Sequence, residues 1–244
     1  MLPIGDRNPT RTTPFVNYAL LFINIAVFVL ERSIITQGGE AWLVPGYGLV
    51  PTRFMNDVPG EAFTIFTSMF MHGGWLHLGG NMLFLYIFGD NVEDSVGHLR
   101  YLVFYLLSGI GAAAAQVLTN PASQLPMVGA SGAIAGVLGA YVVLFPSAPI
   151  TVLNPPPLSF FIGFFIVVPA WFVIGAWFLV QLLSGVGSLG EAETGGVAFF
   201  AHVGGFLAGL LLVKPLQSGR PRFDHDRWSG WRPPERATAR GRWS

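Results

Sequence analysis

Long apolar stretches recur along the whole chain and limit its fold more than any other feature. Loops that are polar or rich in proline and glycine separate these stretches, which are Phe15 to Leu30, Trp75 to Phe88, Leu99 to Leu118, Met127 to Phe145, Leu158 to Leu183 and Gly196 to Val213. A helix needs about 20 residues to cross a bilayer, because each residue adds only about 1.5 Å. The sequence therefore predicts an all-α membrane protein, a bundle of six transmembrane helices.

Composition supports this class and excludes several kinds of chemistry. Hydrophobic residues make up 52% of the 244 residues and charged residues only 11%, whereas soluble domains have about 25% charged residues. The chain contains no cysteine, which excludes disulfides, thiolate catalysis and sulfur-ligated metals. We expect one membrane domain, no nucleic-acid partner, and catalysis, if there is any, by a serine or a carboxylate.

The distribution of charge predicts domain limits and orientation. Residues 1–14 form a short N-terminal segment without the features of a signal peptide, residues 15–216 the membrane domain, and residues 217–244 a basic, disordered tail with seven arginines. Six spans place both termini on one side, and the positive-inside rule makes that side cytoplasmic. We expect a prokaryotic plasma membrane. Membrane lipids are expected partners, and tryptophans in the tail leave open whether it binds them or is only solvated.

Other segments allow more local expectations. Residues 31–61 are rich in glycine and proline and contain Trp42 and Tyr47, which indicates a long interfacial loop. Residues 146–157 contain too many prolines to be helical. Pro169 lies inside the predicted fifth span, where we expect it to kink the helix.

Four polar side chains stand at one depth in the apolar spans. His77, Ser131 and His202 lie within the first two turns of the second, fourth and sixth spans, all of which enter from the outer side. Asn81 follows His77 by four residues and so shares its helix face. A lone serine in such a helix usually bonds a backbone carbonyl, but ionisable groups in membranes tend to line functional pathways. Four such groups at one level indicate a site.

Small residues would let these helices approach closely. The fourth span has Gly132, Gly136 and Ala140 at four-residue intervals, and the sixth has Ala201, Gly205 and Gly209. Such faces allow close contact between membrane helices. A serine can pass its proton to an imidazole only at hydrogen-bond distance, about 2.6 to 3.2 Å, so close packing is what a reaction between Ser131 and His202 requires.

The surroundings of Ser131 fit an acyl-transfer site. Gly129 and Ala130 leave the start of the fourth span uncrowded, and N–H groups in a first helical turn have no intrahelical partner. A carbonyl attacked by Ser131 would gain negative charge beside them, with His77 and Asn81 as further donors. No Asp or Glu lies within a span near His202, so we infer a Ser-His dyad without an orienting carboxylate.

Four motifs in order resemble the rhomboid family of intramembrane serine proteases. "MHGGWLHLGGNMLFLYIFGDNVED" and "GHLRYLVFYLLSG" resemble its second and third spans, "GASGAIAG" its nucleophile segment, and "GGVAFFAHVGGFLAGLLL" its sixth span. The resemblance implies Ser131 as nucleophile, His202 as general base, and His77, Asn81 and the Ser131 N–H as the oxyanion site. It implies a supporting role for His72, in addition to the supporting positions expected from packing at Gly129, Gly132, Gly205 and Gly209. It further implies an acyl-enzyme mechanism without cofactor or metal, acting on single-span or multi-span membrane proteins.

The chain departs from the family pattern in two places. The Trp-Arg pair in the first loop of some members is replaced by Phe63 and Thr64, and the aromatic residue four positions after the nucleophile is replaced by Ala135. Another side chain must then support the ring of His202. The glycine-rich residues 184–196 are expected to act as a mobile gate over the site.

Alternative functions remain open from the residues alone. The same polar groups could line a transporter or channel, although no mid-span acidic residue supports ion coupling. A catalytically inactive relative could bind client helices without cutting them. A metal hydrolase built on His72 and His77 is less consistent, because five-residue spacing separates the rings on a helix and no carboxylate completes the ligand set.

Overall fold

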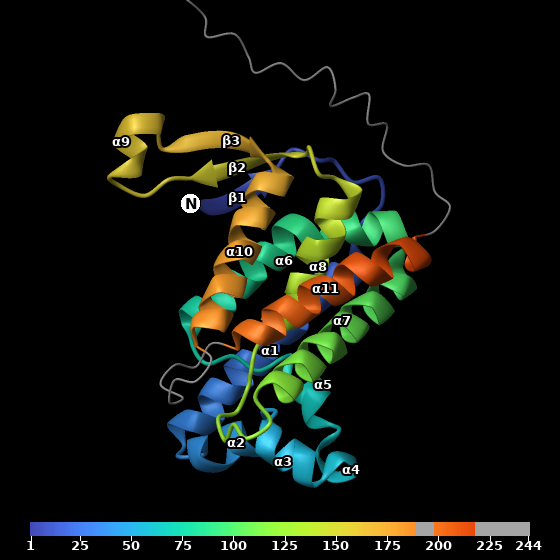
Figure 1. The fold of residues 1–244 in the computed structure, drawn as a ribbon, viewed down its shortest axis with the longest axis vertical. Helices are drawn as coiled ribbons and strands as arrows, with labels where there is room; N and C mark the ends of the chain where they lie inside the picture. The colour runs from blue at the N-terminus through green and yellow to red at the C-terminus, as the bar shows by residue number, and fades with distance from the viewer. Residues whose placement is uncertain (189–197, 218–244) are drawn as a thin grey trace, which may run out of the picture.

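The protein folds as a helical bundle around one central helix. The computed structural model describes residues 1–188 and 198–217. The long helices are α1 (Phe15–Thr36), α6 (Trp75–Val96), α7 (His98–Thr119), α8 (Ser131–Leu144), α10 (Ala170–Gly187) and α11 (Phe199–Leu216). Helix α8 lies inside, with α6, α7, α10 and α11 packed around it (Figure 1). The predicted class, a helical membrane protein, is confirmed.

Within residues 1–188 and 198–217, four helices are long and apolar enough to cross a membrane by themselves: α1, α7, α10 and α11. Helix α8 is apolar but has only 14 residues, or about 21 Å of helix. Helix α6 has 22 residues and carries three acidic residues in its second half: Asp90, Glu93 and Asp94. Four of the six predicted spans therefore correspond to helices that can cross a membrane, and the spanning role of α6 and α8 stays a prediction.

Glycines bring α11 into backbone contact with α8, as the small-residue faces predicted. A Cβ atom on Gly205 would lie 1.9 Å from the carbonyl oxygen of Gly132, and one on Gly209 would lie 2.0 Å from that of Gly136. Both distances are far inside van der Waals contact. Helix α7 joins the same core, since a Cβ on Gly132 would lie 2.5 Å from Cβ of Ala112. The positions next to Ser131 and His202 thus fix how closely their helices approach.

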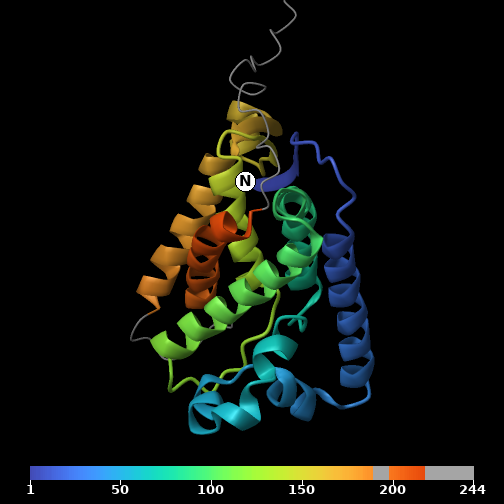
Figure 2. The ribbon, with the colours of Figure 1, turned by 90° about the vertical axis from the view of Figure 1, so that its right-hand side faces the viewer.

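A small sheet covers one end of the bundle, and the sequence did not predict it. Strands β1 (Leu2–Asp6), β2 (Pro149–Leu153) and β3 (Phe165–Pro169) pair antiparallel in the order β1-β2-β3. The described N-terminus and the last turn of α11 lie at this end (Figures 1 and 2). Both described ends of the chain are therefore on one side of the bundle.

The prediction of a fifth span from Leu158 to Leu183 was wrong in its first part. That stretch contains the short helix α9 (Leu158–Ile162) and strand β3, and α10 begins only at Ala170. Pro169 is the residue before the helix rather than a kink within it. The proline-rich residues before α9 are not helical, as expected, and β2 forms from them.

The opposite end consists of short helices in place of the irregular loop that the sequence indicated. Residues 31–61 continue α1 to Thr36 and then form α2 (Glu40–Tyr47), α3 (Pro51–Asn56) and α4 (Val58–Glu61), which α5 (Thr64–Ser68) follows. They lie at the lower ends of α1 and α7 (Figure 1). Trp42 and Tyr47 are exposed there, as expected of interfacial aromatic residues.

Candidate active site

Ser131 is the first residue of α8. The fourth helix was predicted to begin at Met127, which is wrong: residues before Ser131 are not helical, and Met127 instead bridges Leu49 in an isolated antiparallel pair. Gly129 has a φ of 130°, in the region that favours glycine, and its N–H donates to the Ser68 carbonyl at 2.8 Å. This turn places Ser131 at the helix N-terminus, where backbone N–H groups lack intrahelical partners.

The hydroxyl of Ser131 meets the ring of His202. Oγ lies 2.7 Å from Nε2, although the two residues are 71 positions apart in the chain. His202 is in the first turn of α11, and the glycine contacts between α8 and α11 allow this approach. The sequence predicted that these two side chains would touch, and the structure brings them together.

Asn81 lines the same site and carries a buried donor. The side chain is 8% exposed, and its Nδ2 has no hydrogen-bond partner among the described residues. A buried amide without a partner costs free energy that a bound acceptor would recover. A buried donor without a partner is what we expect of a group that binds a ligand oxygen.

His77 lies against the turn before Ser131. A Cβ on Gly129 would be 2.8 Å from both Cε1 and Nε2 of the ring, so only glycine fits at this position. Nδ1 of His77 accepts a hydrogen bond from the Gly73 N–H at 3.4 Å. In the neutral ring the proton is then on Nε2, the nitrogen that faces the nucleophile turn.

His72 lies behind His77 and does not reach Ser131. Its ring packs against that of His77 with centroids 5.2 Å apart, and its backbone N–H donates to Oε2 of Glu31 at 3.2 Å. Burial, with a smaller contribution from His77, lowers the pKa of His72 to about 4. His72 is thus a neutral ring that supports His77. Among the described residues, no group of three His, Asp, Glu or Cys side chains could hold a metal.

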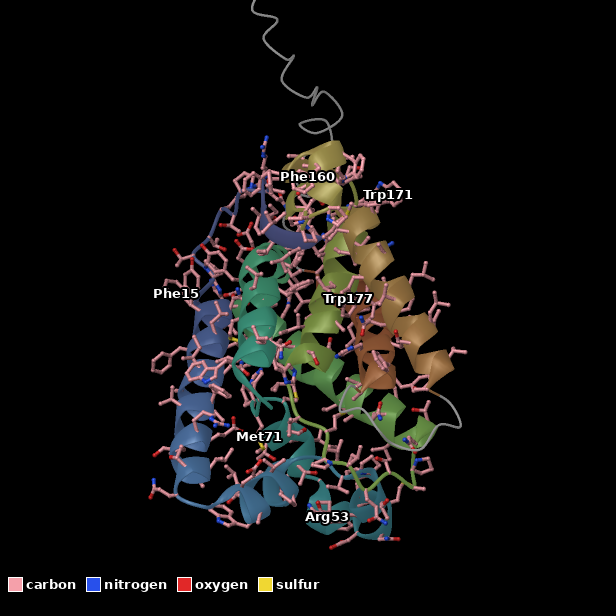
Figure 3. The ribbon with its side chains drawn as sticks, turned by 90° about the vertical axis from the view of Figure 1, so that its left-hand side faces the viewer. Phe15, Arg53, Met71, Phe160, Trp171 and Trp177 are labelled. Carbon is pink, nitrogen blue, oxygen red and sulfur yellow. The ribbon has the colours of Figure 1, made fainter. Side chains whose placement is uncertain are left out.

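Two side chains of α10 contact His202, and sequence reasoning did not identify either. Oε1 of Gln181 lies 2.7 Å from Nδ1 of the ring. The indole of Trp177 packs on the same ring with a centroid distance of 5.8 Å; Figure 3 shows Trp177 in the middle of the bundle. Ala135 is too small to support the ring of His202, and Trp177 takes that place. A polar Gln in an apolar helix was the available signal.

A cavity of about 430 Å³ opens over these groups. Ser131, His202, His77 and Asn81 line it together with apolar side chains from α6, α8, α10 and α11. Residues 189–197, which include most of the predicted gate, lie outside the described residues, as does nearly all of the predicted basic tail. The cavity therefore brings an imidazole, a hydroxyl group and hydrogen-bond donors together in one site.

Comparison with known proteins identifies the architecture. The Rhomboid domain family matches residues 59–218. The chain is 30% identical over 217 residues to Rhomboid protein 1, mitochondrial, of Saccharomyces cerevisiae, and this match covers 84% of the chain and 55% of the yeast protein. It is 34% identical over 157 residues to Rhomboid-like protease 5 of Toxoplasma gondii, covering 62% of the chain and 16% of that protein.

A third relative differs in the activity that its name states. The chain is 24% identical over 160 residues to Inactive rhomboid protein 1 of Drosophila melanogaster, covering 66% of the chain and 10% of the fly protein. The chain spans about half of the yeast relative and much less of the other two. Similarity to these proteins therefore does not decide between an active and an inactive member.

Proposed function

Because the chain belongs to the rhomboid family, we propose that it is an intramembrane serine endopeptidase that cleaves membrane proteins within or next to their spans. The rhomboid family consists generally of intramembrane serine proteases and also includes inactive members. The observation that supports an active enzyme is the 2.7 Å contact between Ser131 Oγ and His202 Nε2 inside a cavity. A chain that only binds client helices has no need of that contact.

In the acylation half-reaction, His202 removes the hydroxyl proton while Oγ of Ser131 attacks the scissile carbonyl carbon. The tetrahedral intermediate carries its negative charge on the former carbonyl oxygen. When the C–N bond breaks, the His202 imidazolium gives its proton to the leaving amine. The carbonyl carbon stays bonded to Ser131 as an ester, the acyl-enzyme. Water then attacks this ester with His202 again as the base; the bond from the carbonyl carbon to Oγ breaks, Oγ takes the proton back from His202, and the product leaves as a carboxylic acid.

The oxyanion would lie beside three kinds of donor. The Ser131 N–H is at the N-terminus of α8, where the positive end of the helix dipole also lies. Nδ2 of Asn81 has no partner among the described residues, and His77 presents Nε2–H. Each preorganised donor of this kind is worth about 3 to 4 kcal/mol of transition-state stabilisation in other hydrolases.

We expect the substrates to be single-span or multi-span membrane proteins whose helices unwind locally. An intact helix keeps its carbonyls in hydrogen bonds, so residues that weaken a helix favour access of Ser131 to the carbonyl carbon. Bilayer lipids surround the exposed apolar faces of α1 and α10, where fewer than a quarter of the residues are buried. We propose no cofactor and no nucleic-acid partner.

The chain is an integral membrane protein, and its orientation is part of this proposal. The described N-terminus and the last turn of α11 lie at one end of the bundle, which fits termini that are both cytoplasmic, with residues 15–216 as the membrane domain. The prokaryotic plasma membrane stays a prediction without support from the relatives, since the yeast protein is named as mitochondrial.

Replacement of Ser131 by Ala tests the proposal. The purified wild-type protein in detergent should cleave a single-span test substrate, and it should react with a fluorophosphonate that labels activated serines. Ser131→Ala should lose both activities while its melting temperature stays unchanged. Undiminished cleavage by the variant, or absence of labelling and cleavage in the wild type, would refute the protease assignment. A flux of ions or solutes in proteoliposomes that is independent of Ser131 would favour the transporter alternative.

A further inference from the structure

Gln181 contacts His202 at the nitrogen that Ser131 does not use. Oε1 of Gln181 lies 2.7 Å from Nδ1, and Oγ of Ser131 lies 2.7 Å from Nε2. Each ring nitrogen thus has one polar partner from a different helix. We propose that Gln181 is a positioning residue that holds His202 in the tautomer with its proton on Nδ1. This inference rests on the proposed protease function and adds a positioning residue to the pair of Ser131 and His202.

The need for this tautomer follows from the proton transfer. A neutral imidazole carries one N–H and one lone pair, on different nitrogens. His202 can take the Ser131 proton only when the lone pair is on Nε2, so the N–H must be on Nδ1. The carbonyl oxygen of Gln181 can accept a hydrogen bond from Nδ1–H but cannot donate one. Its position therefore favours the reactive tautomer over the unreactive one.

Helix α10 restrains the ring by a second contact. Trp177 precedes Gln181 by four residues, so both project from one face of the helix. The indole of Trp177 packs at a centroid distance of 5.8 Å and an interplanar angle of 41°. Contact with the indole limits tilting of the imidazole, and the hydrogen bond from Nδ1 limits its rotation. Both the orientation and the tautomer of the base then depend on α10.

An amide suits this position better than a carboxylate would. The site lies within the bundle, where an ionised carboxylate costs several kcal/mol to bury unless it is paired. A carboxylate would also favour the charged form of the ring, which cannot act as a base. Of the described residues that line the cavity, His77 is the only other imidazole, and no Asp, Glu, Lys or Arg faces His202 there. Gln181 orients the ring without adding charge.

The first variant removes the acceptor and keeps the volume. Gln181→Leu should lower kcat for a single-span test substrate by about 10- to 100-fold, the effect of one lost buried hydrogen bond. KM should stay within about twofold, because the substrate carbonyl is bound by other groups. Val180→Leu, on the exposed face of α10, serves as the matched control and should keep wild-type kcat. Equal kcat values for Gln181→Leu and the wild type would overturn the proposal.

The second variant restores an acceptor but adds charge, and it gives a readout that a merely structural role would not move. Gln181→Glu should recover much of the kcat lost in Gln181→Leu at alkaline pH. The acid limb of its pH–rate profile should move to higher pH by about one unit or more, because a carboxylate stabilises the imidazolium. A profile that coincides with that of the wild type or of Gln181→Leu would contradict the assigned role.

A spectroscopic measurement separates failure of this inference from failure of the protease assignment. Histidine-selective ¹⁵N NMR, with His202→Ala to assign the signal, should show Nδ1 protonated in the wild type and a mixture of tautomers in Gln181→Leu. If the wild type cleaves no substrate but the tautomer still depends on Gln181, the protease assignment fails and the positioning stands. If the wild type is active and the tautomer is the same in both proteins, the positioning fails alone.

Discussion

At the scale of single residues, Asn81 offers the sharpest test of the oxyanion site. Its Nδ2 is buried without a partner among the described residues, so Asn81→Ala removes an unsatisfied group rather than a bond. We expect kcat to fall by about 100- to 1,000-fold, as for other oxyanion donors, while the melting temperature stays equal or rises. Kinetics and thermal unfolding of one preparation measure both.

Asn24→Ala is the control for this prediction. Asn24, in α1, is fully buried like the Asn81 amide nitrogen, but its Nδ2 donates to the Leu20 carbonyl at 2.7 Å. That variant should lose stability and keep kcat. A kcat in Asn81→Ala close to that of the wild type would remove Asn81 from the oxyanion site.

The site residues that the sequence predicted are those whose depth in the membrane follows from their distance to the start of a predicted helix. His77, Asn81, Ser131 and His202 all lie in the N-terminal parts of their helices, and the structure gathers them around one cavity. Gln181 was missed although it stands near the outer end of the predicted fifth span. No acidic residue in the spans lies near His202 in the sequence, but an uncharged amide can also accept a hydrogen bond from its ring in an apolar site. Which face of α10 turns toward His202 depends on packing that the sequence does not show.

At the scale of elements, the packing of α11 on α8 should control activity through one glycine. Gly205→Ala would place Cβ 1.9 Å from the Gly132 carbonyl oxygen, so the helices must separate next to Ser131 and His202. We expect the free energy of unfolding to fall by about 1 to 3 kcal/mol, the usual cost of overpacking. The rate of cleavage should fall by more than this loss of stability explains. The hydrogen bond between Ser131 and His202 weakens when its partners separate by a few tenths of an ångström.

Gly175→Ala provides the matched control for this prediction. Gly175 is in the exposed face of α10, and a Cβ there would meet nothing within 4 Å. Its replacement should leave cleavage unchanged and raise helix stability by up to about 1 kcal/mol. Equal activities in the two variants would show that close contact between α8 and α11 is not required.

Helix positions were predictable from apolar length, but several boundaries were not. The segment before α10 is as apolar as a span, yet Phe165–Pro169 pairs with β2 as a strand. Hydropathy measures transfer into an apolar surrounding and does not distinguish a helix from a strand. The other strand that pairs with β2 is β1, from the N-terminus. Pairing between segments so far apart in the chain has no local sequence signal. The start of α8 depends on the positive φ of Gly129. Composition does not predict that backbone angle.

At the scale of the whole molecule, the enclosed helix α8 links the candidate site to the sheet at the other end. Ser131 begins α8, and Tyr141, fully buried near its end, donates a hydrogen bond to Oδ2 of Asp6 at 2.5 Å. Asp6 is the last residue of β1, so this bond ties the N-terminal strand to the central helix. The bundle thus depends on a carboxyl group that belongs to no span.

The buried Asp6 should make the stability of the whole bundle depend on pH. Burial raises the pKa of Asp6 from 3.8 to about 6, and the hydrogen bond from Tyr141 only partly opposes this. The folded state therefore holds the proton more tightly than the unfolded state. The contribution to stability is fully present below about pH 4 and is lost as the pH rises through about 6, with a total change on the order of 1 to 3 kcal/mol.

Thermal unfolding in detergent between pH 4 and 8 measures this effect as the difference between the wild type and Asp6→Asn. An amide cannot titrate, so the variant should lack the loss of stability between about pH 4 and pH 6 that Asp6 causes in the wild type. Thr151→Val, on the adjacent strand β2, changes a side chain of the sheet without removing a titratable group and should retain the wild-type curve. Parallel curves for the wild type and Asp6→Asn would mean that Asp6 has the same pKa in the folded protein as in the unfolded chain.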